Sequence, residues 1–495
     1  MESEYKDIGL FWQPLGGNNN DQISGHCYCY TLNSPNHFTR ILIDLGKFDN
    51  HQALGVRNSR AAVPDIVDIL QDKTPPSALL LTHSHPDHMN GIVHYIRAGY
   101  KLPKIYGGRY TKLVLDELYD EFKINPNQRP EFEIISVGDC LIFNDFDVEV
   151  LSSSHTCFDT LGFIIKTPYA TVYHTGDMKL DASTCFRKPT SIKRLKQKAK
   201  DIDWVIVDFC DVIEDGYAIT EKENLKCFYS LLKNTPNKKV FIPVYPTHLE
   251  MYIITFLAAL KYKRDVIFYG NHDFYCYLDI LKQYGIDFCK LAKKRIKVYR
   301  YPDVNFQEIG KNFVVIGTFN DVAEEFSASQ KNSFGIITAK TFFNPLKGKF
   351  NAHNIPFTDI NKHNHLQACG HGHLRDIEAL NKILPNSGFI PTHCPVFVID
   401  YFRKLASFLK LKLIKQTPHN GQIYKLKKDD ACLIAKKEAF WLVSAMDSDK
   451  LIRVKQKPTS GEGFLKRTIS RRKCLKKFQE YLHKRKSKGV KHAKI

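Results

Sequence analysis

Four possible metal ligands lie within six consecutive positions of this chain: His83, His85, Asp87 and His88. Imidazole and carboxylate groups bind Zn²⁺, Mn²⁺ and similar divalent ions. Two histidines two positions apart can reach one ion, and the Asp-His pair that follows can reach a second. A lone His-x-His pair is usually incidental, but this longer pattern directly follows the apolar run 78–81. The spacing therefore predicts a metal site with room for two ions.

Three further candidate ligands follow apolar runs elsewhere in the chain. His155 follows EVLSSS, Asp177 ends TVYHTGD, and His393 follows GFIPT. Each residue alone also fits an ordinary structural role, that of a buried histidine or of an aspartate that caps a turn. Their common position, at the ends of apolar runs, indicates that they converge on the same site as the first cluster.

The apolar runs themselves predict the elements that position these residues. Several are short and end in polar or glycine residues, as buried strands with functional ends do. The clearest are residues 40–46, 77–83, 147–153 and 171–177. A helix is expected directly after the first cluster.

Between residues 204 and 345 the pattern changes to an alternation of strands and helices, which predicts a parallel α/β unit. The helices are expected near residues 220–234, 246–263 and 273–285. A later section returns to the first style, with a helix expected from about Leu374 to Leu384 and a strand at 388–393. Residues 340–365 are interpreted as the connection between the two styles.

Length and composition indicate a folded, cytoplasmic protein. The 495 residues are too many for one simple core, so two or more domains are expected. No apolar run approaches the ~20 residues that span a bilayer, and the N-terminus lacks the apolar core of a signal peptide. The 13 cysteines include no Cys-x-x-Cys pair, which favours a reducing compartment.

The net charge of +20 is concentrated at the C-terminal end. Residues 450–495 contain 17 basic and two acidic residues, which indicates a polyanionic partner, most simply nucleic acid. The alternatives are a tail that only aids solubility, or one that binds another protein or the ribosome. Some of its apolar residues recur at roughly helical spacing, which predicts a short amphipathic helix. They are Leu465, Ile469, Leu475, Phe478 and Leu482.

The order of these motifs resembles that of metallo-β-lactamase hydrolases of the β-CASP branch, and within that branch the ribonuclease J family. THSHPDH (82–88) resembles the family's THGHEDH, and residues 154–181 resemble its stretch ending in THTGD. Three more segments resemble its LGxxxxIPDIxxL, SGHAS…IPVHGE and NGxxxxL motifs. They are residues 54–70, 369–394 and 420–426. The resemblance covers roughly residues 8–430.

The resemblance implies an α/β fold, a metallo-β-lactamase αββα sandwich interrupted by a β-CASP parallel α/β domain. It implies that the sandwich is formed by two separate parts of the chain and that a short basic extension follows. The expected segments are 1–205 and 366–432 for the sandwich, 206–365 for the insertion and 433–495 for the basic tail.

The resemblance also implies a role for each candidate residue. One ion is held by His83, His85 and His155. The other is held by Asp87, His88 and His393. Asp177 bridges both ions, Asp208 orients a ligand histidine from behind, and His371 contacts the scissile phosphate. The residues expected to take part directly in catalysis are Asp87, His88, Asp177 and His371.

Hydrolysis of RNA by two divalent ions is the activity that the resemblance implies, with Zn²⁺ expected first and Mn²⁺ or Mg²⁺ as alternatives. Cleavage would leave a 5′-phosphate, either internally or from the 5′ end. Two other functions stay open. One is a nuclease for DNA or for one structured RNA, and the other is a non-catalytic RNA-binding protein. A homodimer is also possible.

The chain departs from ribonuclease J mainly inside the insertion. Of the family's SNxHR it keeps His248, and of GSQGE it keeps Gly317 and a hydroxyl at Thr318. His373 stands where the family has a serine. These three residues, His248, Thr318 and His373, are candidate RNA contacts. Because the surrounding residues have changed, the resemblance does not decide between internal and 5′-end cleavage.

Overall fold

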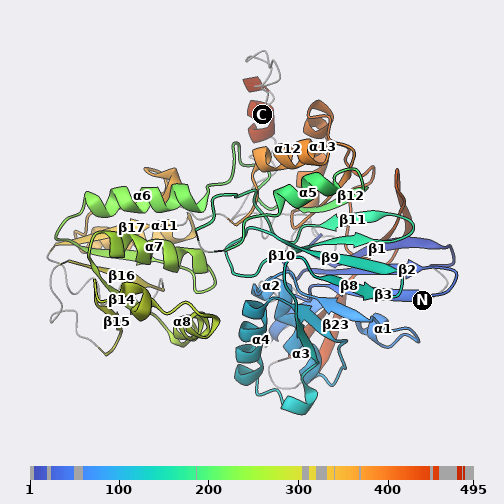
Figure 1. The fold of residues 1–495 in the computed structure, drawn as a ribbon, viewed down its shortest axis with the longest axis horizontal. Helices are drawn as coiled ribbons and strands as arrows, with labels where there is room; N and C mark the ends of the chain where they lie inside the picture. The colour runs from blue at the N-terminus through green and yellow to red at the C-terminus, as the bar shows by residue number, and fades with distance from the viewer. Residues whose placement is uncertain are drawn as a thin grey trace.

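The computed structural model describes residues 5–18, 24–48, 59–185, 187–303, 312–318, 332–338, 340–366, 370–445, 450–455, 476–481 and 483–484. Figure 1 shows two bodies side by side: a sandwich of two sheets on the right and a third sheet with its helices on the left. The sandwich contains both ends of the described chain, and the third sheet is formed by its middle.

The first sheet of the sandwich has eight strands and is mixed. In spatial order they are β21 (Ala431–Lys436), β20 (Gln422–Leu426), β1 (Gly9–Gly16), β2 (Cys27–Asn33), β3 (Phe38–Ile43), β5 (Ala78–Leu80), β6 (Ile105–Gly107) and β7 (Phe132–Ile134). β2 runs antiparallel to β3, whereas β3, β5, β6 and β7 run parallel. The start of β2 therefore lies at the same edge as the carboxyl ends of β3 and β5.

The second sheet has six strands. They are β19 (Gly388–Thr392), β12 (Trp204–Asp208), β11 (Thr171–His174), β10 (Leu161–Lys166), β9 (Phe146–Ser152) and β8 (Cys140–Phe143). β12 pairs in parallel with both β11 and β19. The expected boundary at residue 205 thus falls inside a strand of the sandwich that runs to Asp208.

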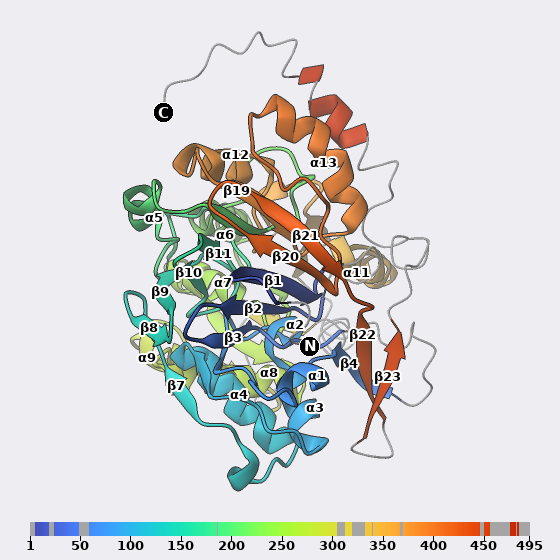
Figure 2. The ribbon, with the colours of Figure 1, turned by 90° about the vertical axis from the view of Figure 1, so that its right-hand side faces the viewer.

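The two sheets enclose one apolar core, and helices cover their outer faces (Figure 2). Large side chains such as Trp12, Phe163 and Ile206 fill the space between the sheets, and their burial supplies most of the driving force for the sandwich. Outside the first sheet lie α1 (Val67–Leu70), α3 (Gly91–Arg97) and α4 (Arg109–Glu121). Outside the second lie α5 (Ile192–Lys198), α12 (Leu374–Ile383) and α13 (Val396–Phe408). This αββα arrangement confirms the predicted fold class.

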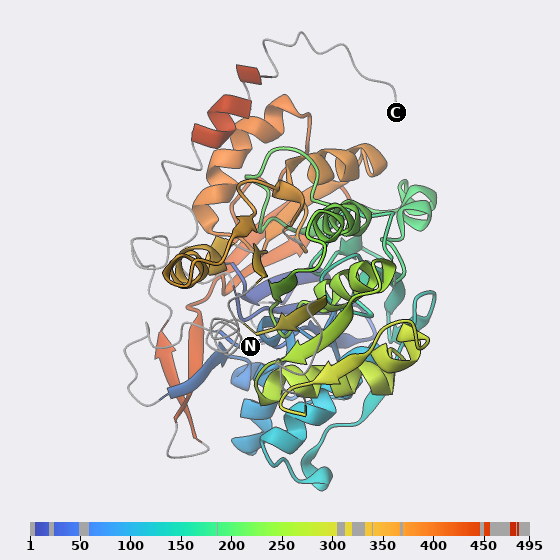
Figure 3. The same cartoon turned by 90° about the vertical axis from the view of Figure 1, so that its left-hand side faces the viewer.

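The third sheet consists of six parallel strands and faces the viewer in Figure 3. They are β15 (Val298–Arg300), β14 (Asp265–Tyr269), β16 (Phe313–Gly317), β13 (Lys239–Pro243), β17 (Ser333–Ile337) and β18 (Phe357–Asp359). On β13, Val240 and Ile242 belong to one core and Phe241 to another. Both faces of the sheet are therefore covered, as a parallel sheet requires.

Helices lie on both faces of the third sheet. One face carries α6 (Glu221–Lys233), α7 (Leu249–Lys261), α8 (His272–Tyr284) and α9 (Phe288–Ala292), and the other carries α11 (Lys340–Ala352). Thr220 and Glu223 cap the start of α6 reciprocally, which satisfies two of the amides that a helix start leaves unbonded. The alternation of strands and helices expected between residues 204 and 345 is thus present, and the three helices begin and end within a few residues of their expected bounds.

Residues 340–365, expected to be a connection, instead form α11 and β18. Pro345 and Gly348 make this segment a poor helix by sequence. Leu346 and Phe350 are nevertheless buried against the third sheet, and this tertiary packing outweighs the local propensity. β18 then adds a parallel strand at the edge of the sheet, beside β17.

The segment 433–495, expected to be a basic tail, also contains folded elements. β22 (Phe440–Ala445) and β23 (Leu451–Lys455) form a three-stranded sheet with β4 (Ser59–Pro64), visible in Figure 2. Residues 476–481 are helical, and Phe478 and Tyr481 are buried in the core that contains α12 and α13. The fold therefore extends beyond residue 432. The other apolar residues of the expected tail helix lie outside the described residues.

Candidate metal centre

The cluster of candidate ligands lies where β5 meets a short helix. β5 ends at Leu80, His83 and His85 follow in extended chain, and α2 (Pro86–Met89) then begins. Proline at the first helical position suits this start, because its missing N–H would have no partner inside the helix. Asp87 and His88 are carried by α2, so the turn presents all four side chains at the edge of the first sheet.

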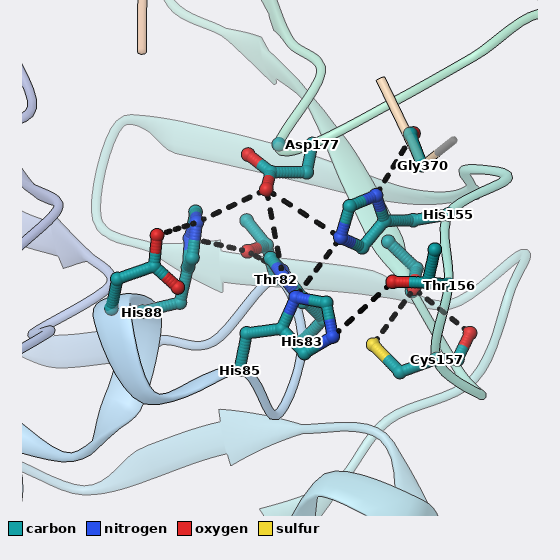
Figure 4. Close-up of polar contacts among 12 residues, drawn as sticks. Thr82, His83, His85, His88, His155, Thr156, Cys157, Asp177 and Gly370 are labelled. Atoms are coloured by element: carbon teal, nitrogen blue, oxygen red, sulfur yellow. Dashed lines mark hydrogen bonds and ion pairs between the residues drawn. The ribbon is translucent and has the colours of Figure 1, made fainter. Parts of the chain in front are cut away.

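One set of side chains, here called the first ligand group, consists of His83, His85, His155 and Asp177. Their ligand atoms all lie within 4.8 Å of one another. His85 Nδ1 is 3.0 Å from His155 Nε2, and Asp177 Oδ2 is 3.7 Å from His83 Nε2 and 3.6 Å from His155 Nε2. Figure 4 shows His83 and His155 joined to the Asp177 carboxylate, and His85 joined to His155 and Thr156.

The second ligand group consists of three imidazoles, those of His26, His88 and His393, whose nitrogens also lie within 4.8 Å of one another. Asp177 reaches this group as well, with Oδ2 3.3 Å from His88 Nε2 and Oδ1 3.0 Å from His393 Nδ1. Asp87 Oδ2 lies 3.9 Å from Nε2 of both His88 and His393. One carboxylate, that of Asp177, therefore lies between two groups of imidazoles.

His26 was not among the residues predicted from sequence. It lies directly before β2, with no apolar run in front of it and no other histidine nearby in the sequence. The structure brings it to the site because β2 is antiparallel to its neighbour β3. The His26 amide donates to the Asp87 carbonyl at 2.7 Å, and the Gly46 amide donates to the His26 carbonyl at 2.9 Å.

Hydrogen bonds from behind hold the imidazoles in place. His88 Nδ1 lies 2.8 Å from Asp44 Oδ2, and His83 Nδ1 lies 2.9 Å from the Thr82 hydroxyl, which also contacts Asp44. His155 Nδ1 lies 2.9 Å from the Gly370 carbonyl. Such contacts on one ring nitrogen fix the direction of the other, and here they direct the opposite ring edge toward the space around Asp177.

A further histidine, His371, lies beside the two ligand groups. This residue precedes α12, and its Nδ1 lies 2.7 Å from Asp208 Oδ2 at the end of β12. Burial opposes protonation of the ring, but the Asp208 carboxylate outweighs this effect and raises the pKa of His371 to about 10. His371 Nδ1 is also 3.9 Å from Asp177 Oδ2, so a cationic ring lies beside the candidate metal centre.

Burial gives the ligand imidazoles unequal protonation behaviour. It lowers the pKa values of His26, His83 and His155 well below the usual range, so these rings are neutral and able to bind a metal. For His88, burial acts in the same direction, but the carboxylates of Asp177, Asp87 and Asp44 outweigh it and raise its pKa well above the usual value.

The residues of the two groups fit divalent metal ions. Among the described residues, the Nε2 atoms of His26, His83 and His88 are buried and have no hydrogen-bond partner. Leaving a buried polar atom unsatisfied costs about 1–3 kcal/mol. A metal ion is the partner that imidazole nitrogens and carboxylates arranged in this way would accept.

The three candidate RNA contacts differ in their position relative to the two ligand groups. His248, directly before α7, has its ring centre 6.2 Å from that of His85, so it approaches the first ligand group from the third-sheet side. Burial lowers its pKa to about 3. Thr318 follows β16 in the third sheet, and His373 begins α12. Neither of these two belongs to the groups described above.

Comparison with known proteins finds similarity over part of this chain. Residues 39–221 match the family model described as a beta-lactamase superfamily domain. Ribonuclease J of Thermus thermophilus is 27% identical over 42% of this chain and 37% of its own length. Ribonuclease J of Sinorhizobium meliloti is 26% identical over 54% of this chain and 46% of its own length. Ribonuclease J of Helicobacter pylori is 24% identical over 64% of this chain and 43% of its own length.

This chain thus spans less than half the length of the curated relatives that it matches. A crystal structure of a protein of unknown function from Enterococcus faecalis shares the fold, with a TM-score of 0.57 and 16% identity over 86% of this chain and all of the other. The matches confirm the predicted resemblance to ribonuclease J and the metallo-β-lactamase fold. Within the described part of the chain, none of the helices combines the length and apolar character needed to cross a membrane.

Proposed function

We propose that this protein is a metal-dependent phosphodiesterase that hydrolyses RNA with two divalent ions. The observation that carries the proposal is the position of Asp177. Its carboxylate lies within 3.7 Å of imidazole nitrogens in both ligand groups. A carboxylate shared in this way suits a pair of ions that act on one phosphate.

Each ion would be held by residues that the structure brings together. His83, His85 and His155 would hold the first, His88, His393 and Asp87 the second, and Asp177 would bridge them. Two ions bound there would activate a water molecule and neutralise phosphate oxygens. We propose Zn²⁺ as the natural ion because imidazole nitrogens dominate the ligand set.

His371 would act on the substrate rather than on the ions. Asp208 accepts a hydrogen bond from its Nδ1 and keeps the ring protonated. The Nε2 nitrogen on the opposite edge of the ring would then donate to a phosphate oxygen or to the leaving oxygen. Asp208 also lies 3.6 Å from His393 Nδ1, whose hydrogen-bond partner is Asp177 Oδ1 at 3.0 Å.

RNA is the proposed substrate because the curated relatives with similar sequence are named ribonuclease J. The third sheet approaches the metal centre through His248, as a substrate-binding wall would. The family residues around Thr318 that resemble a 5′-phosphate pocket have changed in this sequence. We therefore propose internal cleavage that leaves a 5′-phosphate and does not require a 5′-monophosphate end. The scattered cysteines favour a cytoplasmic setting.

The test is incubation of the purified chain, with Zn²⁺ or Mn²⁺, on RNAs that carry a 5′-monophosphate, a 5′-triphosphate or a 5′-hydroxyl, and on single-stranded DNA. Equal internal cleavage of the three RNAs is the expected result. A preference for DNA would replace the RNA assignment, and no cleavage at all would leave an RNA-binding protein. The control is the double variant Asp87→Ala/His88→Ala, because activity that survives in it comes from elsewhere.

The basic C-terminal segment is proposed to contact the RNA backbone. Its helical residues 476–481 are anchored on the folded body, since Phe478 and Tyr481 are buried in the core that contains α12 and Lys477 pairs with Glu214. Changing Arg471, Arg472 and Lys473 to glutamine should flatten the salt dependence of RNA binding by about 2 in the log–log slope, at about 0.7 per contact.

The matched control for the tail changes three basic residues that already pair with carboxylates. They are Lys104, Arg129 and Lys415. This control removes the same charge and should leave the slope unchanged. An equal change in both triple variants would mean that the effect comes from net charge alone, and an unchanged slope in both would remove the tail from the RNA interface.

A further inference from the structure

His26 is the member of the second ligand group that the resemblance does not supply. Its side chain is about 1% exposed. Its ring centre lies 4.2 Å from those of both His88 and His393, stacked on the first and edge-on to the second. Its Nε2 is 3.7 Å from Asp87 Oδ2. His26 thus lies among the three residues proposed to hold the second ion.

The orientation of the His26 ring is fixed from the opposite side. Its Nδ1 lies 2.9 Å from the hydroxyl of Tyr28, the second residue of β2. In the tautomer in which Nδ1 donates to the Tyr28 oxygen, Nε2 carries a lone pair on the side of Asp87. This is the arrangement of a metal-binding histidine, in which one nitrogen is bonded to the protein and the other to the ion.

The Nε2 atom of His26 shares a property with two residues of the proposed ligand set. Within the described residues, Nε2 of His26, His83 and His88 are all buried without a hydrogen-bond partner. A histidine that served only to fill space would leave this atom unsatisfied, at a cost of about 1–3 kcal/mol. A metal ligand would not, because the ion takes the lone pair.

A second buried histidine shows the alternative. The ring of His174, in β11, has its Nδ1 3.0 Å from the Tyr30 hydroxyl and lies edge-on to Tyr28. Like His26, it is buried and has a tyrosine hydroxyl as the partner of its Nδ1, but it belongs to neither ligand group. His174 has the environment of a packing histidine, whereas His26 faces other ligands.

We propose that His26 is a direct ligand of the second divalent ion, which deepens the proposed function and rests on its two-ion centre. With His88 and His393 it would give that ion three imidazole nitrogens in addition to carboxylate oxygens. Imidazole-rich sites favour Zn²⁺ and Co²⁺ over Mg²⁺, which prefers oxygen ligands. The second position should therefore bind Zn²⁺ and exclude Mg²⁺ at equal concentration.

The test measures metal binding on the full chain, separately from RNA cleavage. His26→Asn and the matched His174→Asn are compared with the wild type by metal analysis after dialysis against Zn²⁺, by competition with a chelator of known affinity, and by the visible absorption of Co²⁺ added in steps. The wild type and His174→Asn should bind two ions, with the second Co²⁺ step giving its own absorption change. His26→Asn should bind the second ion at least ~100-fold more weakly and lose that change.

Two outcomes overturn the proposal. One is a His26→Asn variant that binds both ions with wild-type affinity and an unchanged Co²⁺ spectrum. The other is an equal loss in His174→Asn, which would assign the effect to packing. Should His26→Asn fail to fold, Tyr28→Phe removes only the hydroxyl that orients the ring, and it should weaken the second ion by about 10-fold. Wild-type affinity in Tyr28→Phe would then overturn the proposal.

The experiment distinguishes a failure of the His26 assignment from a failure of the proposed ribonuclease function. If the wild type binds two ions and cuts none of the RNAs, the ribonuclease assignment fails while the assignment of His26 stands. If the wild type cuts RNA and His26→Asn retains both ions, the assignment of His26 fails alone.

Discussion

The two ligand groups differ in the hydrogen-bond partners that orient their imidazole rings. In the first group, Nδ1 of His83 and His155 faces neutral partners, the Thr82 hydroxyl and the Gly370 carbonyl, both at 2.9 Å. In the second group, His88 Nδ1 faces the Asp44 carboxylate at 2.8 Å. A carboxylate behind an imidazole makes it a stronger ligand. The two positions are therefore unequal, and we expect the second ion to be held more tightly than the first.

The largest effect is expected from the loss of Asp177, because its carboxylate contacts imidazoles of both ligand groups. In Asp177→Ala we expect both ions to be lost and RNA cleavage to fall on the order of 1,000-fold or more. Metal analysis and single-turnover cleavage measure the two effects. Asp201→Ala, at an exposed carboxylate, is the control. Retention of both ions in Asp177→Ala would exclude a bridging role.

A variant of His371 tests whether this residue, which lies beside both ligand groups, is itself a metal ligand. In His371→Ala we expect both ions to remain bound and kcat to fall about 100- to 1,000-fold, because the donor to the phosphate is removed. The comparison with His363→Ala, an exposed histidine, controls for loss of an imidazole. A His371→Ala variant that binds fewer ions would assign this histidine to the ligands instead.

The expected difference in metal affinity between the two ligand groups depends on Asp44. Asp44→Ala removes the direct partner of His88, and Thr82→Val removes the hydroxyl that contacts both His83 and Asp44. We expect Asp44→Ala to weaken the second ion about 10- to 100-fold and Thr82→Val to weaken the first ion by less. Stepwise removal of Zn²⁺ with a chelator measures both. Equal affinities of the two positions in the wild type would contradict the asymmetry.

A variant of Gly46 tests the close packing of the backbone segments that place His26 in the second ligand group. A Cβ placed on Gly46 would lie 1.6 Å from the Asp87 carbonyl oxygen, so the backbone would have to move. We expect Gly46→Ala to lower the free energy of unfolding by about 1–3 kcal/mol, measured by urea denaturation. Gly348→Ala is the matched control, since a Cβ there meets nothing within 4 Å and alanine favours the helix. Equal stability of the two variants would show that the contact can relax.

The local sequence was sufficient to predict the residues of the first ligand group and most strands and helices of the fold. His83 and His85 follow β5 of the first sheet, and His155 follows β9 of the second. Each of them lies just beyond the carboxyl end of a buried apolar strand, and this local pattern is what identified them. The alternation of strands and helices between residues 204 and 345 predicted the third sheet for a similar reason, because parallel strands need helical crossovers. Strongly periodic apolar patterns survive tertiary context.

Local sequence failed where long-range packing decided the outcome. Residues 340–352 contain proline and glycine and still form α11, because Leu346 and Phe350 are buried against the third sheet. β22 (Phe440–Ala445) follows the expected end of the fold, yet it pairs with β4 (Ser59–Pro64), far earlier in the chain. Strand pairing over such distances leaves no local signal in a single sequence.

The sequence by itself therefore determined the chemistry at the ends of the strands: imidazoles and carboxylates suited to a pair of divalent ions. Only the tertiary structure decided which further side chains reach them. His26 stands before its strand rather than after it, and it reaches the site because β2 runs antiparallel to β3. The direction of a strand in a sheet is set by pairing with its neighbours, so it was decided only when the chain folded.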